Sequence, residues 1–352
     1  MRILATAVAI AAALLGSAAA APIQFEVCHV GSLDATRDFT RAYAINDLGH
    51  VIGQSAAAGR LPAFFWSRSN GIRQLTPEPV DSFIIPNAVN DRDQVTGTTF
   101  RDGAVRAFVW SKASGLQFLQ DVADPFQPTA GMSINDLGEI VGTADLGPFI
   151  WDRVRGVRRL GPILDLQTAI PNDINNFGRV TGSGGGATGF RTFVVDARSS
   201  RQRALELDEA KAINARGQVA GFIVVSGEFE MFARFHAAIW DSTNGLRDID
   251  PQPREQGFSQ ANDINNAGVV VGGGNGGAFI WTERTGMLRL DDLIDRSDPD
   301  VQFVTIQDAK AINNFGWIAA DGGDSRSPAA VRAFVLIPRT ERGLARRPLC
   351  DE

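Results

Sequence analysis

Short apolar runs alternate with turn-forming residues along most of the chain, and one pattern among them recurs. It consists of an apolar residue, Asn, two variable residues and Gly, followed by apolar residues and, in most copies, a second Gly. Its copies begin at Asn46, Asn90, Asn135, Asn175, Asn214, Asn265 and Asn313. Successive copies lie 39 to 51 residues apart, so the period is near 45 residues. Periods of this size are typical of solenoids, propellers and other arrays of one supersecondary unit.

The Asn-x-x-Gly segment predicts a β-hairpin. Asn at the first turn position can bond the backbone two residues further on, and Gly at the fourth supplies the positive φ that reverses the chain. In the second copy Asp93 replaces this Gly. Asp is among the few residues that tolerate a left-handed conformation, so the same turn is expected there.

Two further short elements follow each hairpin. The third element is an apolar run that usually ends in Trp, as in residues 63–66, 107–110, 148–151 and 278–281, with weaker versions at Thr192, Ala237 and Ala333. The fourth element begins with Gly, as in residues 71–75, 115–119, 156–160 and 286–290. Each repeat therefore predicts four short strands joined by turns.

Strands that are apolar on both faces need cover on two sides, and no helical pattern of period 3.6 is present to provide it. Neighbouring repeats must cover one another, as they do in a ring of four-stranded sheets packed face to face. The small residues of the first strands fit a crowded inner position, and the Trp and Phe residues of the third strands fit the wider periphery. The sequence therefore predicts an all-β, seven-bladed β-propeller formed by residues 21–352 as one domain.

The two ends of the chain are expected to close this ring. Residues 24–30 precede the first repeat and have no blade of their own, and the last repeat has only a poor match for an outer strand at residues 343–349. We expect the N-terminal segment to enter the last blade as an outer strand. A Cys28–Cys350 disulfide would cross-link it to the C-terminal tail, as is common in exported proteins. Unpaired or intermolecular cysteines are the alternative.

The first 20 residues predict a secretory signal peptide. Arg2 precedes an apolar run over residues 3–15, and small residues with an Ala-x-Ala cleavage pattern end at Ala20. A membrane span needs about 20 apolar residues, so a retained anchor is the weaker interpretation. No later stretch is apolar enough to span a membrane. The mature protein is expected to begin at Ala21 and to be secreted or periplasmic.

The repeats resemble those of the HAF repeat proteins, a family of extracellular bacterial repeat proteins named for a His-Ala-Phe motif before the aromatic strand. The resemblance covers essentially the whole mature chain and implies a secreted β-repeat fold, but little about a substrate. Only His236 keeps the eponymous His. The other copies hold Pro62, Arg106, Gly147, Arg191, Gly277 and Arg332. A role that depends on a ring of histidines is therefore excluded.

Charge and side-chain chemistry exclude several classes of function. The formal net charge is −6 and the basic residues are scattered, so nucleic acid is not an expected partner. The three His residues are not at metal-ligand spacing, and no dense acidic calcium loop is present. We expect no metal, no cofactor and no thiol nucleophile. Carboxylate chemistry remains open, because the chain has 40 Asp and Glu residues.

Function is expected in the loops that join the second and third strands of the repeats, because rigid scaffolds carry binding residues on loops. The candidate ligand residues are Arg101, Asp102, Arg106, Phe229, Glu230, Phe232, Arg234, His236, Asp324 and Arg326. For the longest loop, around Phe229, a simple extension of two strands is an equal alternative. The favoured function is a secreted binding or scaffolding module with an unknown extracellular ligand, glycan or protein. The alternatives are an extracellular propeller enzyme, a carboxylate-dependent hydrolase or lyase acting on polysaccharide, and a structural envelope or matrix component.

Overall fold

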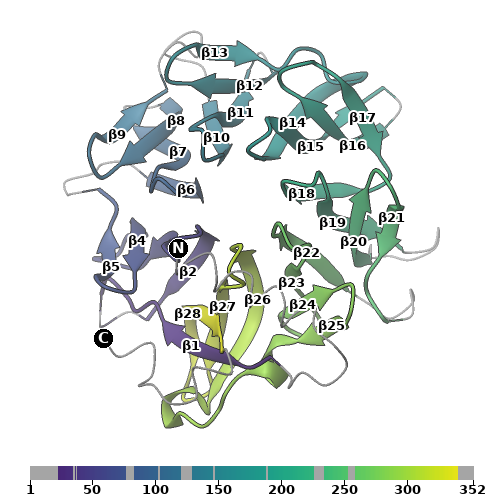
Figure 1. Ribbon diagram of the computed structural model, residues 1–352. Coiled ribbons are helices and arrows are strands. Elements are labelled where there is room, and N and C mark those ends of the chain that lie inside the picture. The colour runs from purple at the N-terminus through teal and green to yellow at the C-terminus, as the bar shows by residue number, and fades with distance from the viewer. Residues whose placement is uncertain are drawn as a thin grey trace, which may run out of the picture.

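The computed structural model describes residues 23–339, apart from 35, 37, 77–82, 102–103, 120–128, 146, 188, 226–233 and 253–257. These residues form an all-β propeller, in which antiparallel sheets stand side by side around a central axis (Figure 1). Helix is limited, in this part of the chain, to the two short 3-10 segments η1 (Leu290–Leu293) and η2 (Pro299–Val301). The predicted signal peptide, residues 1–20, lies outside the described residues.

Five of the sheets in the described ranges have four strands each, and in all five the strands pair in chain order. The first contains β2 (Thr40–Ile45), β3 (Val51–Ser55), β4 (Ala63–Ser67) and β5 (Gly71–Gln74). The second contains β6 (Phe83–Val89), β7 (Val95–Arg101), β8 (Ala104–Ser111) and β9 (Gly115–Phe118). The third contains β10 (Thr129–Ile134), β11 (Ile140–Ala144), β12 (Gly147–Asp152) and β13 (Gly156–Arg159).

The remaining two of these five sheets follow the same plan. The fourth contains β14 (Leu166–Ile174), β15 (Arg179–Gly186), β16 (Gly189–Asp196) and β17 (Gln202–Leu205). The fifth contains β18 (Glu209–Ile213), β19 (Val219–Val224), β20 (Phe235–Asp241) and β21 (Gly245–Asp248). The predicted division of each repeat into four short strands is thus confirmed for the first five repeats.

The last two repeats are joined into one eight-stranded sheet, where the sequence predicted two separate blades. It contains β22 (Ser259–Ile264), β23 (Val270–Gly274), β24 (Phe279–Thr282), β25 (Gly286–Arg289), β26 (Val304–Ile312), β27 (Ile318–Asp324), β28 (Ser327–Pro338) and β1 (Phe25–His29). The junction is the pairing of Gly273 in β23 with Asp308 in β26. Asp308 Oδ1 lies 2.5 Å from where a Cβ of Gly273 would stand, so the glycine permits this close approach.

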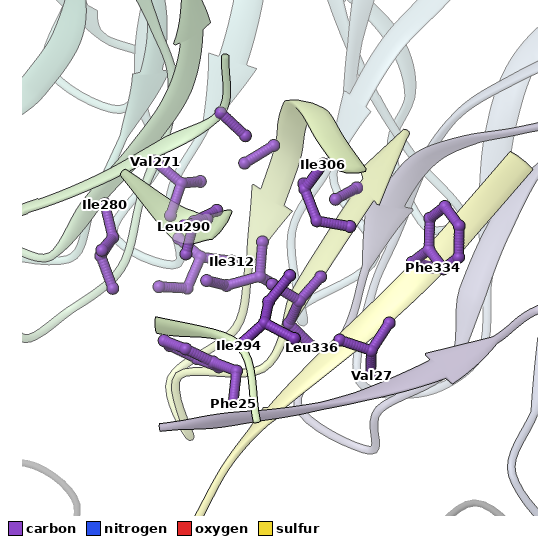
Figure 2. Packing of buried hydrophobic residues seen from close by; sticks show 14 of the residues in the cluster. Phe25, Val27, Val271, Ile280, Leu290, Ile294, Ile306, Ile312, Phe334 and Leu336 are labelled. Carbon is purple, nitrogen blue, oxygen red and sulfur yellow. The ribbon is translucent and has the colours of Figure 1, made fainter. Parts of the chain in front are cut away.

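The N-terminal segment lies where the sequence placed it, as an outer strand beside the last strand of the chain. β1 pairs antiparallel with β28, from Phe25 opposite Pro338 to His29 opposite Phe334. Figure 2 shows Phe25 and Val27 of β1 packed in one hydrophobic cluster with Leu336 of β28. The cluster also includes residues of β23, β24 and β26. Burial of these side chains fixes β1 to β28.

The hairpin turns have the predicted conformations. The turn glycines, such as Gly49 at φ 77°, have positive φ, and Asp93 at φ 57° takes the place of Gly in the second copy. The Asn side chain bonds two backbone groups of its own turn. Asn265 Oδ1, for example, accepts from the N–H groups of Ala267 and Val269 at 3.0 and 3.1 Å. The turns thus satisfy backbone donors that the strands leave unpaired.

Each first strand contains a β-bulge at the same place, three residues before the repeat Asn. The register shifts around the extra residues, which are Tyr43, Asn87, Met132, Asn172, Lys211, Asn262 and Lys310. All seven are half-buried. Because a bulge redirects side chains and sharpens strand twist, it lets the innermost strands bend around the axis. The sequence pattern gave no sign of these bulges.

Candidate functional site

The seven repeat asparagines form a closed circle of hydrogen bonds around the axis. The Nδ2 atom of each Asn donates to the backbone oxygen of the next, at 2.9 to 3.1 Å. The circle runs through Asn46, Asn90, Asn135, Asn175, Asn214, Asn265 and Asn313, and Asn313 returns to Asn46. Sequence reasoning had assigned these residues only to the hairpin turns. Each therefore has a second role, which is to join one repeat to the next.

A second set of bonds joins the residues that follow these asparagines. Asp47 N–H donates to Asp91 Oδ1 at 2.7 Å, and Asp91 N–H donates to Asp136 Oδ1 at 2.9 Å. The same contact recurs along the ring, and at its end Asn314 N–H donates to Asp47 Oδ1 at 2.8 Å. In the fifth repeat this position is Ala215, which has no side-chain acceptor.

Both sets of residues line a hollow of about 180 Å³ at the hairpin end of the propeller. Its lining is uneven in charge. The first three repeats contribute Asp47, Asp91 and Asp136, and the other repeats contribute amides or alanine. Burial raises the pKa of Asp91 to about 6, and repulsion by neighbouring carboxylates adds to the effect, while the hydrogen bond from Asp47 N–H opposes it. Chemically, this hollow is a set of hydrogen-bond acceptors concentrated on one side.

One sequence pattern could have predicted this hollow. An acid or its amide follows the repeat Asn in six of the seven copies, with Ala215 as the exception. A turn needs no particular side chain at that position, so its polarity could have indicated a polar ring at the axis.

The opposite end of the propeller carries the connections between second and third strands, because the first strand runs toward the hairpin and the second runs back. Large apolar side chains are exposed there. Five phenylalanines lie at or beside the strand ends here, and they are 37% to 66% exposed. They are Phe83, Phe100, Phe190, Phe258 and Phe303. At the hairpin end, Leu48, Leu137 and Phe177 are comparably exposed, at 51% to 56%.

Four of the predicted ligand residues cannot be placed. Asp102, Phe229, Glu230 and Phe232 lie outside the described residues. Arg101 ends β7 and pairs with Ala104 of β8. The predicted center of the ligand surface, the loop around Phe229, is therefore not described.

Arg106 and Arg234 border connections at this end. Arg106 lies on β8, and its guanidinium stands over the ring of Phe118, 5.1 Å from the ring centroid. Arg234 precedes β20, and its carbonyl accepts from Val225 N–H at 2.9 Å. Both residues are half-buried.

His236 and Asp324 are buried, in contrast to their predicted place on an exposed surface. His236 Nδ1 lies 3.0 Å from Asp248 Oδ2, in a contact between β20 and β21. Asp324 accepts from both Arg326 and Arg332, and these ion pairs hold its pKa far below the usual range. Each of these buried polar side chains has a partner that offsets the cost of its burial.

Of the predicted residues, the structure brings Asp324 and Arg326 together. Arg326 is exposed and also stands over the ring of Phe303, 5.1 Å from its centroid. Sequence reasoning missed the partners of this pair. Arg332 links Asp324 to Asp38, which precedes the first repeat. Exposed apolar and cationic groups therefore meet at this part of the propeller end.

Within the described ranges, no three His, Cys, Asp or Glu side chains are grouped so that they could hold a metal ion. Among the same residues, no helix has the length and apolar character needed to cross a membrane.

Comparison with solved structures places the chain among β-propellers. The RRP9 WD40 repeats superpose with a TM-score of 0.59 at 11% identity, over 90% of this chain and 100% of that chain. A streptogramin B lyase gives a TM-score of 0.55 at 10% identity, over 90% of this chain and 98% of the lyase. Virginiamycin B lyase from Staphylococcus aureus gives 0.55 at 9% identity, over 90% and 99%. At these identities the likeness shows the fold alone.

Sequence comparisons gave no relatives. No protein-family model matches the chain, and no curated protein matches it either.

Proposed function

We propose that this propeller is an exported binding or scaffolding protein whose ligand, an extracellular protein or glycan, contacts the end opposite the hairpins. The observation that carries this proposal is the set of exposed phenylalanines at that end, Phe83, Phe100, Phe190, Phe258 and Phe303. Aromatic side chains are enriched where proteins bind partners, because they bury a large area at low entropic cost.

Arginine side chains near these phenylalanines also favour this end as the binding surface. Arg326 is exposed beside Phe303, and Arg106 lies beside the β7–β8 connection. Apolar rings rimmed by arginines are typical of binding hot spots. The strands behind them are tied by the closed circle of Asn bonds, which makes a rigid support for variable loops.

Replacing Phe100, Phe190 and Phe258 together by Ser tests this proposal. We expect at least about tenfold weaker binding to any partner found with a glycan array or by co-purification from culture medium, because aromatic anchors dominate binding energy. The Tm should fall only slightly, because Phe100 and Phe190 are exposed and Phe258, which packs at an edge against Phe235, is already 37% exposed. Phe177→Ser is the matched control at the hairpin end and should bind normally. Full binding by the triple variant would move the ligand site to another surface.

We further infer that the eight-stranded sheet represents two blades, which would make seven blades in a closed ring. Its halves, β22 to β25 and β26 to β28 with β1, are bridged by the Gly273–Asp308 pair. The bond from Asn313 to Asn46 continues the same series of contacts from the last repeat to the first. This assignment agrees with the seven sequence repeats. It also agrees with the resemblance to HAF repeat proteins. We propose that the chain belongs to that family.

The proposed closure includes a Cys28–Cys350 disulfide. Cys28 is buried in β1, whereas Cys350 lies outside the described residues. In the chain-entropy model, a cross-link enclosing more than 300 residues could add up to about 5 kcal/mol to the free energy of unfolding. Peptide mapping of the exported protein without reductant should recover the linked pair. Free thiols at both positions, or a disulfide-linked dimer, would contradict this closure.

A further inference from the structure

Three aspartates connect neighbouring repeats near the axis, and the function proposed above does not use them. Asp321 is buried, and Asp173 and Asp263 are half-buried residues. Asp173 in β14 and Asp263 in β22 occupy the same repeat position, directly after the bulge residue. The other repeats hold Ala44, Ala88, Ser133, Ala212 and Ala311 at this position. Asp321, in β27, is the third. A carboxyl where most repeats have a methyl group must be explained by a contact that alanine cannot make.

Asp173 and Asp263 each bind a backbone donor of the next repeat. Asp173 Oδ2 accepts from Ile213 N–H, and Asp263 Oδ2 accepts from Ile312 N–H, both at 2.8 Å. The Oδ1 atom of each accepts from the residue that follows it in the chain, at 2.8 and 2.7 Å. Asp173 Oδ1 also accepts from the Ser133 hydroxyl of the preceding repeat, at 2.7 Å. Each carboxyl thus ties its own inner strand to the next one.

Asp321 makes the equivalent tie between the last repeat and the first. Its Oδ1 accepts from Ala42 N–H at 2.9 Å. Ala42 lies in β2, the first strand of the first repeat, so this bond spans the two ends of the repeat series. Asp321 is almost completely buried, at 6% exposed.

Cations do little to balance these carboxyls. In the described part of the chain, neither Asp173 nor Asp263 has an ion pair. The strands packed beside them, β18 and β26, contribute Lys211 and Lys310, which pair with Glu209 and Asp308 of their own strands. Asp263 instead feels the like charge of Asp173.

The surroundings of Asp321 are mixed in charge. Lys310 lies 3.7 Å away, and the charges of Arg41 and Asp308 act on it in opposite senses. The Tyr43 hydroxyl is also near enough to feel the charge of Asp321. One cation at 3.7 Å does not offset the cost of burying the carboxylate.

We propose that Asp173, Asp263 and Asp321 are proton-dependent latches, which join neighbouring repeats most firmly when they carry a proton. A protonated carboxyl can still accept a backbone hydrogen bond, and it avoids the cost of a buried charge. Burial raises the pKa of Asp263 to about 7 and that of Asp321 to about 6, and it also raises the pKa of Asp173. The hydrogen bonds that each carboxyl accepts favour the charged form and offset only part of this effect. In the unfolded chain these groups titrate at about 4.

The sign of the pH dependence follows from these directions. Because the folded protein holds these protons more tightly than the unfolded chain does, the latches add stability as the pH falls from 8 toward 5. Below about pH 4 this gain is complete. Carboxyls with lowered pKa values, such as Asp241 and Asp295, then lose their stabilising charge. Stability should therefore pass through a maximum in mild acid.

The test is thermal unfolding of the full chain between pH 8 and 5 at constant ionic strength. We expect the Tm to rise by roughly 5 °C as the pH falls. In the Asp173→Ala, Asp263→Ala double variant the rise should be less than half as large. Alanine at these positions is compatible with the fold, because four other repeats carry it there. The exposed carboxylate variant Glu283→Gln is the control and should keep the full rise.

A spectroscopic measurement keeps the proposal testable if the double variant does not fold. The infrared band of protonated carboxyls should be present in the native protein at pH 6, and the single variant Asp263→Ala should weaken it. Asp91 is retained in every variant, so its own proton cancels in the comparison. A flat or falling Tm between pH 8 and 5 in the native protein would overturn the proposal. So would an undiminished rise in the double variant, or an unchanged infrared band in Asp263→Ala.

Discussion

Asn265→Ala should lower the free energy of unfolding by about 3–4 kcal/mol, because it leaves several backbone groups of the axial circle without partners. The substitution removes the acceptor of the Ala267 and Val269 N–H groups. It also removes the donor to the Asn313 carbonyl in the next repeat. Urea unfolding followed by tryptophan fluorescence measures the effect, since the chain has six tryptophans.

The neighbouring residue provides a matched control. Asn266 also binds the adjacent repeats, but it is exposed and its side chain accepts one bond, from Ala215 N–H at 2.8 Å. Alanine already occupies this position in the fifth repeat, so Asn266→Ala should cost less than about 1 kcal/mol. Equal losses for the two variants would show that the circle of Asn bonds is not what stabilises the inner strands.

Gly221→Ala should be at least as damaging, with a loss of roughly 4 kcal/mol or of folding altogether. A Cβ at this position would stand 1.8 Å from the carbonyl oxygen of Glu209 and 2.9 Å from its carbon. Both atoms belong to the backbone of β18 beside the bulge, so no side-chain rotation can relieve the overlap. The yield of soluble protein and its urea midpoint measure the effect.

The control for this prediction is Gly276→Ala. A Cβ there would meet nothing within 4 Å, and its φ is not in the left-handed region. We expect a change of about 0.5 kcal/mol or less in either direction. If Gly221→Ala unfolds at the same urea concentration as this control, the inner strands must be able to move apart at little cost.

The equivalent glycine occurs in six repeats, and the seventh shows what its loss requires. Gly53, Gly97, Gly142, Gly182 and Gly272 stand in the same position and make the same close approach to a carbonyl oxygen. In the seventh repeat this position is Ala320. There β26 has a further register shift, between Ile306 and Asp308. Alanine is therefore accommodated where the partner strand is already displaced. β18, the partner strand of Gly221, has no such further shift.

Much of the fold could be predicted from the sequence because its causes are local. An Asn side chain bonds the backbone of its own turn. The positive φ at the end of the turn is adopted by Gly in six repeats and by Asp93 in the second. The hairpins therefore follow from short stretches of chain. The apolar runs between turns then limit each repeat to four strands. Neither the bulges nor the joining of the last two repeats could be predicted, since both depend on how neighbouring strands meet.

The candidate sites show the same limit. Sequence reasoning predicted ligand residues in the loops opposite the hairpins, and exposed phenylalanines lie at that end of the structure. It also placed His236 and Asp324 on the surface, although Asp248 and two arginines hold them inside. Exposure is a property of the packed structure, so a charged residue in a loop-like stretch can still be buried.

The sequence by itself determined the repeat, its turns, the all-β class and the position of the N-terminal strand, because each rests on residue pattern and short-range bonding. Tertiary structure alone decided the second role of the repeat asparagines and the shared surroundings of Asp173 and Asp263. The contacting residues lie 39 to 267 positions apart in the chain. Their hydrogen bonds and repulsions arise when the strands converge on one axis, because electrostatic and hydrogen-bond energies depend on distance in space.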